Sequence, residues 1–488
     1  MRSAAAATTS LLCLCVATSA TVYDFEALGA VADADDVATM NANAALLNRT
    51  LQDLATINGN ELAFPNKTFH LQGGVLASGL RNVTLRLDGT LKFADARKQW
   101  PKGPKGTVMN CLELDDAEGL TLTSSGTGVI DGSGKAWWGA VQYALHQEDR
   151  PKILAVTDSA RIVVEHIHFL NSPYWTTEFK DIDDVVIRHC DVAVRWDEGA
   201  DDHSGLELTA FNTDGFDLSG SNVHIHDCNI WNQDDCVCVK DIAPTAKRAS
   251  CSENWLVERV NASGLGLTIG SIGGSAAPGG MCVRNITFRD STMHATVKGL
   301  YLKARWLRDG ESATIEDVLY ENITIDRPEQ WSIWVGPAQQ ADSSHVCSLA
   351  WPQASPAAKC PISPLVNWRN ITMRDIRIRD PKESPGVVIG AQGNPIQGLV
   401  FDGVVVTGGK ATGGTWGSGG YACHGVDNAS VAIGGTTPVP PCFNGGKQCR
   451  ADGECMKKDD MPCCSGKSHA TLDCGVQPRC GDASYMRK

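Results

Sequence analysis

Several features are absent from the sequence, and each absence argues against one class of partner or site. After residue 20, no apolar run approaches the roughly 20 residues of a membrane-spanning helix, so we expect no membrane partner. No long helical pattern recurs after residue 71. Negative charge outweighs positive charge to give a net charge of −13, which disfavours nucleic acid as a partner. No second cysteine pair at zinc-finger spacing follows Cys236 and Cys238, so we expect no metal and no cofactor.

The N-terminus resembles a secretory signal. Arg2 supplies a positive start, residues 11–17 an apolar core, and Ala20 a small residue at a cleavage position. We therefore expect residues 1–20 to be removed and the protein to be secreted as a monomer. Export would expose Asn-x-Ser/Thr sites to glycosylation, although Asn before Ile-Thr or Val-Thr can also simply open a strand; these sites are Asn48, Asn66, Asn82, Asn261, Asn285, Asn322, Asn370 and Asn428.

Cysteine usage agrees with export. Seven of the 19 cysteines lie between Cys442 and Cys480, a density typical of disulfides formed in an oxidising compartment. A Gly-rich and then Pro-rich stretch precedes them, so residues 444–488 form a separate cysteine-rich, knot-like tail. This tail would bind carbohydrate or a partner, or act as a passive cap. Outside it, we expect Cys423 to pair with Cys442 and Cys347 with Cys360.

A short strand motif, often opened by Asn, Asp or Gly, recurs along the chain. After a first strand near Val22 and a helix that is clearest over residues 41–54, the motif returns at irregular spacing of roughly 20 to 40 residues. Short strands without intervening helices favour an all-β fold, a parallel β-helix over residues 21–443. A sandwich or barrel is the alternative, but it would need shorter hairpin connections. Cys190 and Cys228 occupy equivalent places and should stack inside the coils.

Residues 212–240 contain two short acidic motifs, which we call the acidic stations. Asp214 follows Asn212-Thr213, and Asp234-Asp235 follows Gln233 about twenty residues later. If one coil separates the stations, Asp214 and Asp234 stack on neighbouring strands roughly 4.8 Å apart. One carboxylate should then hold its proton at neutral pH, and a protonated acid beside an ionised base suits glycoside hydrolysis.

These motifs, in this order, resemble glycoside hydrolase family 28, the polygalacturonases. The resemblance rests on residues 212–217, then 233–236, then 270–274, with support from residues 128–138 and 170–175. It covers residues 23–443 and implies a right-handed parallel β-helix that acts on a pectin-like, galacturonate-containing polysaccharide. By that resemblance, Asp235 is the general acid, while Asp214 and Asp234 position and deprotonate an attacking water, with inversion. Asn212 and Gln233 would hydrogen-bond the carboxylates or the sugar.

The chain departs from the family pattern at three places. Leu265 stands where the family has a histidine, Tyr301 stands where it has an arginine, and a later tyrosine has no counterpart near Gln339. Lys303 is kept. Tyr301 and Lys303 alternate and so share a face, which Arg305 extends. We expect these three residues to bind substrate, with Tyr301 offering its ring to a sugar.

Two rival functions remain open. A lyase or epimerase on the same fold would abstract a proton beside a uronate carboxylate, with calcium held by Asp201, Asp202 and Asp214. A catalytically silent carbohydrate-binding protein is the second rival, because Leu265 cannot supply the hydrogen bonds of a histidine.

Overall fold

The computed structural model describes residues 21–139, 149–339, 347, 360–409 and 420–443, with three short strands beyond residue 446. The expected secretory signal and most of the cysteine-rich tail lie outside these residues. Within the described part, no helix is both long enough and apolar enough to cross a membrane.

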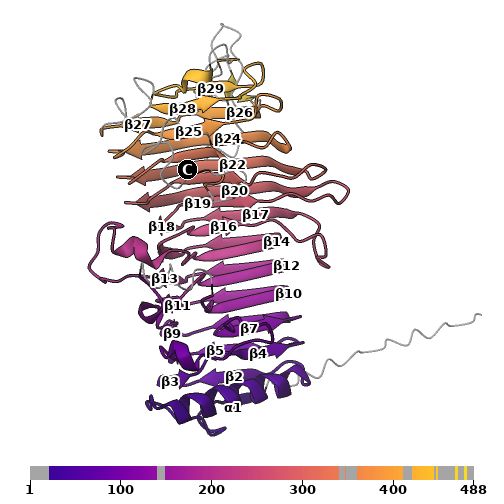
Figure 1. The fold of residues 1–488 in the computed structure, drawn as a ribbon, viewed down its shortest axis with the longest axis vertical. Coiled ribbons are helices and arrows are strands. Elements are labelled where there is room, and N and C mark those ends of the chain that lie inside the picture. The colour runs from indigo at the N-terminus through magenta and orange to yellow at the C-terminus, as the bar shows by residue number, and fades with distance from the viewer. Residues whose placement is uncertain are drawn as a thin grey trace, which may run out of the picture.

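The chain winds into stacked coils whose strands form parallel ladders (Figure 1). This confirms the predicted parallel β-helix and excludes a sandwich or barrel. The first ladder is the longest, and its strands are β1 (Val22–Asp24), β2 (Glu61–Phe64), β5 (Thr84–Leu87), β8 (Glu118–Thr123), β10 (Leu154–Glu165), β12 (Thr177–Arg188), β14 (Phe216–His226), β17 (Ser252–Glu258), β20 (Met281–His294), β22 (Ala313–Asp326), β24 (Val366–Arg379), β26 (Gln397–Asp402), β29 (Ala432–Gly434) and β30 (Lys447–Gln448).

Two further ladders complete each coil, because the longest strands bend and contribute to two ladders. The second ladder includes the C-terminal parts of β20, β22 and β24 and the strands β3 (Thr68–Leu71), β6 (Thr90–Phe93), β9 (Gly128–Asp131), β11 (Ile167–Leu170), β13 (Asp191–Ala193), β15 (Asn229–Trp231), β18 (Asn261–Ser263) and β27 (Val405–Thr407). The third ladder includes the N-terminal parts of β10, β12 and β14 and the strands β4 (Val75–Ser78), β7 (Leu112–Asp115), β16 (Val237–Val239), β19 (Leu267–Ile272), β21 (Leu300–Ala304), β23 (Ile333–Pro337), β25 (Gly386–Ile389) and β28 (Tyr421–His424). Outside the ladders, β31 (Ser468–Ala470) and β32 (Pro478–Cys480) form an antiparallel pair.

Alternating side chains fill the interior of the coils. Along β22 the buried positions recur with the two-residue period of a strand, and side chains at matched register stack from coil to coil. Phe288 and Tyr320 are one such pair, with ring centroids 4.7 Å apart. Cys190 and Cys228 are fully buried free thiols at successive coils, as predicted.

The corners of the coils explain the Asn and Asp residues that open each strand motif. Asn222, Asn254 and Asn285 all adopt the left-handed conformation, which asparagine tolerates better than most residues. Their side chains also form a chain of hydrogen bonds: the amide of Asn285 donates to Asn254 over 2.8 Å, and that of Asn254 donates to Asn222 over 3.2 Å. The repeated asparagine therefore turns the backbone and links neighbouring coils.

Helix α1 (Val37–Ala55) covers the N-terminal end of the coils (Figure 1). Asp36 caps it by accepting a hydrogen bond from the backbone N–H of Thr39. The helix buries Leu47 and Leu51 and contacts β3 and β4. It thereby closes a core that would otherwise meet solvent.

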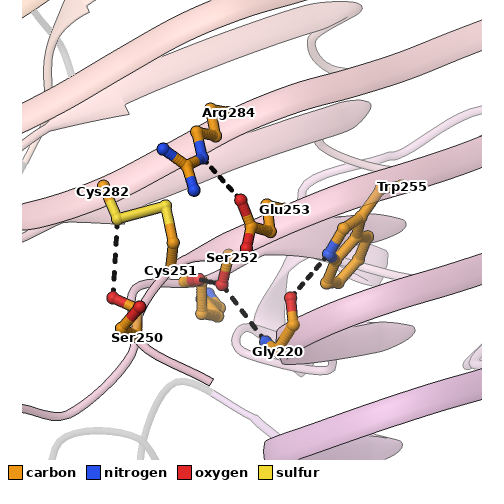
Figure 2. Close-up of a disulfide and its surroundings, with 9 residues drawn as sticks. Gly220, Ser250, Cys251, Ser252, Glu253, Trp255, Cys282 and Arg284 are labelled. Atoms are coloured by element: carbon orange, nitrogen blue, oxygen red, sulfur yellow. Dashed lines mark hydrogen bonds and ion pairs between the residues drawn. A yellow bond between two sulfur atoms is a disulfide. The ribbon is translucent and has the colours of Figure 1, made fainter.

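Three disulfides tie loops to the coils within the described residues. Two of them, Cys347–Cys360 and Cys423–Cys442, are the predicted pairs. The third, Cys251–Cys282, connects the segment before β17 to the start of β20 (Figure 2). Beside it, Glu253 and Arg284 form an ion pair between the same two strands.

Replacing Phe288 by alanine tests the interior stack. The change removes a fully buried ring and its contact with Tyr320, so we expect the free energy of unfolding to fall by about 3–5 kcal/mol. Urea denaturation measures this loss. Thr287→Ala, at the adjacent outward position of the same strand, is the matched control and should cost less than about 1 kcal/mol; equal losses would contradict the inward assignment of Phe288.

Candidate active site

The two acidic stations lie at the entry to consecutive strands of the third ladder. Asp214 lies two residues before β14, and Asp235 lies two residues before β16; the register pairs Phe216 with Val237. The backbone N–H of Gly215 donates to the carbonyl of Asp235 over 2.8 Å. Asp214 therefore lies opposite Asp235 and not, as expected, opposite Asp234, because the coil is one residue longer than expected: residue 216 pairs with residue 237.

Gly215 is required for this close approach. A Cβ atom at this position would lie 2.3 Å from the carbonyl oxygen of Cys236 on the next coil. Any other residue would push the two coils apart at the point where the carboxylates meet.

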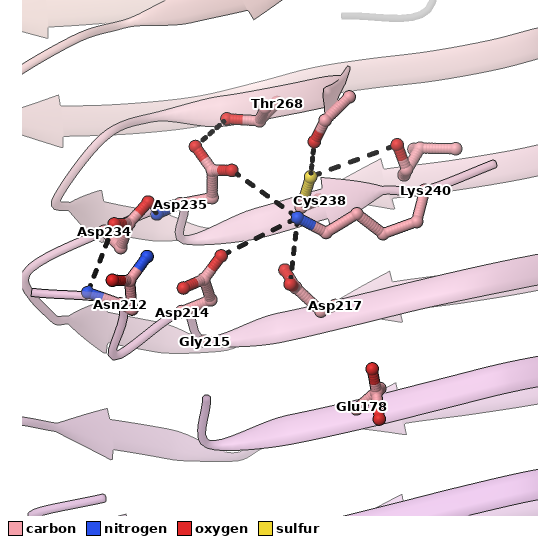
Figure 3. A network of polar contacts seen from close by, with 12 residues as sticks. Glu178, Asn212, Asp214, Gly215, Asp217, Asp234, Asp235, Cys238, Lys240 and Thr268 are labelled. Atoms are coloured by element: carbon pink, nitrogen blue, oxygen red, sulfur yellow. Dashed lines mark hydrogen bonds and ion pairs between the residues drawn. The ribbon is translucent and has the colours of Figure 1, made fainter. Parts of the chain in front are cut away.

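The three predicted acids converge. Carboxylate oxygens of Asp214, Asp234 and Asp235 all lie within 4.8 Å of one another. Asp214 and Asp235 are almost fully buried, whereas Asp234 is partly exposed. Figure 3 shows Lys240 reaching into this group from the end of β16. Its Nζ lies 3.0 Å from Asp217, 3.7 Å from Asp214 and 3.8 Å from Asp235.

Asp235 is held from two neighbouring coils. Lys303 on β21 places its Nζ 3.0 and 2.8 Å from the two carboxylate oxygens of Asp235. The hydroxyl of Thr268 on β19 donates to the Oδ1 atom over 3.0 Å (Figure 3). These charge-assisted contacts fix both the orientation and the ionisation of this carboxylate.

Burial and the two lysines divide the acids into protonated and ionised groups. Burial and the neighbouring carboxylates raise the pKa of Asp214 well above its usual range, and the pKa of Asp234 is raised for the same reasons. Burial raises the pKa of Asp217 to about 6. Asp235 is also buried, yet Lys303 and Lys240 outweigh that burial and lower its pKa. The ionised Asp235 thus lies beside Asp214, whose pKa is shifted strongly in the opposite direction.

This division disfavours the general-acid role that the sequence suggested for Asp235. A general acid must carry a proton at the working pH, and the two lysines keep Asp235 ionised. Asp234 fits the role better, because its pKa is raised and its side chain is partly exposed to an incoming substrate.

The acids lie on the floor of a groove that runs across the outer face of the third ladder. Besides the four aspartates, its lining includes the aromatic rings of Tyr174 and Trp175, and its cationic side chains are Lys180, Lys240, Lys247, Lys303 and Arg305. Acidic side chains outnumber these cations in the lining, so the cations place positive charge between carboxylates and do not make the groove positive overall.

One wall of the groove comes from the connection between β16 and β17. We name residues 241–251 the strap. Arg248 of the strap pairs with Asp158 over 3.1 Å and with Asp116 over 3.5 Å, and its backbone N–H donates to Asp181 over 2.9 Å. Lys247 also pairs with Asp158. The three aspartates occupy the same corner of three successive coils, so the strap lies across coils that precede it in sequence.

The polar residues expected to support the acids divide into two groups. Asn212 lines the groove, and its backbone N–H donates to Asp234 over 3.3 Å. Gln233 is fully buried and faces away: its carbonyl oxygen lies 2.7 Å from His203, and its amide donates to the carbonyl of Val194 over 3.0 Å. Gln233 therefore bonds none of the three predicted aspartates through its side chain; its amide donates to the carboxylate of Glu207 over 3.4 Å instead.

The expectation for Tyr301 also needs correction. Tyr301 does share the outer face of its strand with Lys303, but only 2% of it is exposed, because it packs in a cluster with Trp331, Trp334 and Cys347. Its ring is therefore covered and cannot stack on a sugar. Lys303 and Arg305 do line the groove, and Leu265 packs against the cluster.

Sequence reasoning missed three groups at this site. Lys240, Asp217 and Thr268 carry no role in the motif comparison, yet all three contact the buried carboxylates or each other. A signal for Lys240 was present, because Cys236, Cys238 and Lys240 alternate on one face of β16. Nothing comparable in the sequence pointed to Thr268, whose contact depends on the stacking of β19 on β16.

The calcium site of the rival lyase hypothesis is not assembled. Among the described residues, the one cluster of three or more possible metal ligands is Asp214, Asp234 and Asp235, which includes neither Asp201 nor Asp202. Lys240 and Lys303 already supply positive charge beside those three carboxylates.

Comparison with known proteins decides the family. The family model described as Glycosyl hydrolases family 28 matches residues 55–417. This chain belongs to that family. It is 28% identical over 296 residues to an endopolygalacturonase of Emericella nidulans, a match covering 60% of this chain and 67% of the relative. It is 28% identical over 254 residues to endopolygalacturonase I of Aspergillus niger, covering 51% of this chain and 59% of that protein.

Solved structures agree on the fold of this family 28 member. A polygalacturonase from Erwinia carotovora ssp. carotovora aligns with a TM-score of 0.59 and 19% identity over 88% of this chain and 99% of its own. A hyperthermoactive exopolygalacturonase from Thermotoga maritima aligns with a TM-score of 0.59 and 18% identity, over 80% of this chain and 87% of its own. The chain is thus a glycoside hydrolase with a polygalacturonase-like fold.

Replacing Lys240 by methionine tests the charge balance of the site. The change leaves buried carboxylates without their shared cation, which typically costs about 3–5 kcal/mol of unfolding free energy. The loss should be larger at pH 8 than at pH 4, because the raised pKa values of Asp214 and Asp217 mean that protonation relieves the repulsion at low pH.

Chemical denaturation at the two pH values measures this difference. Lys92→Met, at a lysine whose side chain is 45% exposed, is the control and should cost no more than about 1 kcal/mol at either pH. An equal loss for Lys240→Met at both pH values would show that the lysine acts by packing and not by charge.

Proposed function

We propose that this enzyme hydrolyses glycosidic bonds in a pectin-like, galacturonate-containing polysaccharide. The observation that carries the proposal is the convergence of Asp214, Asp234 and Asp235 within 4.8 Å on the floor of a groove. An acid that keeps its proton beside a carboxylate that stays ionised is the pair that glycoside hydrolysis requires.

The groove also suits an acidic chain. The net charge of −13 would repel a polyuronate, but Lys180, Lys247 and Arg305 line the groove together with the two buried lysines. The side chains of Lys180 and Lys247 are 58% and 76% exposed and pair with Glu178 and Asp158, so binding a uronate carboxylate would require them to exchange these partners.

We assign a proton-transfer role to each carboxylate. Asp234 protonates the departing glycosidic oxygen, because its pKa is raised and it is partly exposed. Asp235 is the base: Lys303 and Thr268 hold it ionised and oriented toward the attacking water. Asp214, opposite Asp235, positions that water. The names of the fungal relatives support polygalacturonan as the substrate, and the three disulfides support an extracellular location.

Incubation with polygalacturonate and a panel of plant and algal wall polysaccharides tests this function. We expect new reducing ends and no products that absorb in the ultraviolet, because hydrolysis leaves no double bond. Unsaturated ends would establish a lyase instead, and binding without cleavage would establish a silent carbohydrate-binding protein.

Substitution of single carboxylates tests the roles. Asp234→Asn and Asp235→Asn should each lower kcat by about 10²–10⁴-fold, since each removes one partner of the proton transfer, and should leave the circular dichroism spectrum unchanged. Asp309→Asn, at an exposed loop position, is the control and should retain the wild-type rate. A wild-type rate for Asp234→Asn would refute its role as the acid.

The stereochemical outcome is a separate prediction. The family resemblance implies inversion, although carboxylate oxygens within 4.8 Å of one another are closer than the roughly 6.5–9.5 Å typical of the paired carboxyl groups of inverting enzymes. We propose inversion, with Asp235 and Asp214 sharing one water. Proton NMR of the first product anomer should show the configuration opposite to that of the substrate; retention would mean that a carboxylate attacks directly.

A further inference from the structure

A buried lysine that takes no part in the mechanism above lies directly behind the site. Lys298 is 3% exposed, and its amine lies 3.0 Å from the hydroxyl of Tyr301. The amine also donates to the side-chain carbonyl of Gln339. Three rings surround it, with centroids 4.2, 5.1 and 5.9 Å from Nζ for Tyr301, Trp334 and Trp331.

The ring of Tyr301 links this lysine to the catalytic carboxylate. Lys303 places its Nζ 4.2 Å from the centroid of the same ring, the distance found for Lys298. Tyr301 thus lies between two amines. On the other side, Lys303 holds both oxygens of Asp235 at 3.0 and 2.8 Å. A continuous set of contacts therefore runs from Gln339 through Lys298, Tyr301 and Lys303 to Asp235.

The register of the third ladder makes this set of contacts rigid. Thr268, Tyr301 and Trp334 occupy matched positions on β19, β21 and β23. Thr268 donates to Asp235, so the column that carries Tyr301 already contacts the carboxylate once. A movement of the Tyr301 ring would be transmitted to Asp235 through Lys303.

We propose that Lys298 is a positioning residue for Asp235, acting through the Tyr301 hydroxyl and the ammonium group of Lys303. The amine of Lys298 donates to the hydroxyl of Tyr301 and to the side-chain carbonyl of Gln339, which fixes the ring. The ring face then serves Lys303, because a cation prefers the negative face of an aromatic ring. This proposal rests on the proposed function, in which Asp235 is the ionised base.

The charges around Lys298 favour the neutral form. Burial, followed by the nearby ammonium of Lys303, lowers the pKa of Lys298 to about 7, against the opposing effect of Asp235 and Asp234. A second ammonium on the Tyr301 ring would repel Lys303 and weaken its hold on Asp235. The arrangement therefore works best when Lys303 is charged and Lys298 is not.

Kinetics of Lys298→Met, Tyr301→Phe and the double variant test the proposal. Each single change should lower kcat about tenfold with little change in KM, and should move the acid limb of the pH profile to higher pH, since a less firmly held Lys303 depresses the pKa of Asp235 less. The double variant should be no slower than the slower single variant, because both changes break the same link. Lys382→Met, at a lysine whose side chain is 52% exposed, is the control and should match the wild type.

Additive losses in kcat, or losses in kcat with an unmoved acid limb of the pH profile, would overturn the proposal and leave Lys298 with a packing role.

A measurement that does not depend on enzyme activity distinguishes this failure from failure of the proposed function. The folded pKa of Lys298 lies below its unfolded value near 10.4, so the unfolded state binds more protons between about pH 7 and 10 and the group's contribution to stability rises with pH.

The Tm of the wild type relative to Lys298→Met should therefore rise across that range. A constant difference in Tm would overturn the neutral lysine, whether or not the enzyme cleaves polygalacturonate. A wild type that cleaves nothing would refute the proposed function, and the Tm comparison would still decide the state of Lys298.

Discussion

The in-register stacking of parallel strands is the constraint on which the rest of the molecule depends. Each coil repeats at about 4.8 Å, so side chains at matched positions form columns whose members are fixed by register alone. The same rule that stacks Phe288 on Tyr320 in the interior sets Asp214 against Asp235 on the outside. The position of these carboxylates thus follows from the same register as the core packing, and Gly215 allows the two coils to approach at that point.

Balanced burial of charge gives the site its chemistry. Placing several carboxylates in one nearly dry group would be strongly unfavourable without cations, and Lys240 and Lys303 supply them from neighbouring coils. The two lysines do not lie equally close to all of the aspartates. Lys303 contacts Asp235 closely, and Lys240 lies closest to Asp217, while burial and the neighbouring Asp235 raise the pKa of Asp234. Position along the ladder therefore sets the direction in which the pKa of each acid is shifted.

The departures from the family pattern form one packing change. Leu265 and Tyr301 belong to the same aromatic cluster, and Gln339 binds the lysine beside it. A histidine or an arginine at either position would bring a charge into a region that is now largely apolar. Leu265 and Tyr301 therefore pack in one region, while Lys303 and Thr268 hold Asp235.

Much of the fold and the identity of the three acids could be predicted from the sequence, because both follow from local patterns. Asn and Asp at the corners, alternation within strands, and two loop-closing cysteine pairs are each visible over a few residues. The errors arose where the outcome depends on distant segments. Tyr301 faces outward as expected, but Trp331 and Cys347 pack over it. The sequence of residues 299–303 alone gives no indication that these distant residues bury the ring. Gln233 faces away because His203, thirty residues earlier, binds it.

The strap has a consequence for how the solenoid comes apart. In a stack where each coil touches only its neighbours, coils can fray singly from either end. Arg248 interrupts that scheme, because it joins the coil after β16 to Asp116 and Asp158, which belong to coils much earlier in the stack. The intervening coils cannot open without breaking those ion pairs. We therefore expect the middle of the solenoid, where the acids lie, to open less readily than its two ends.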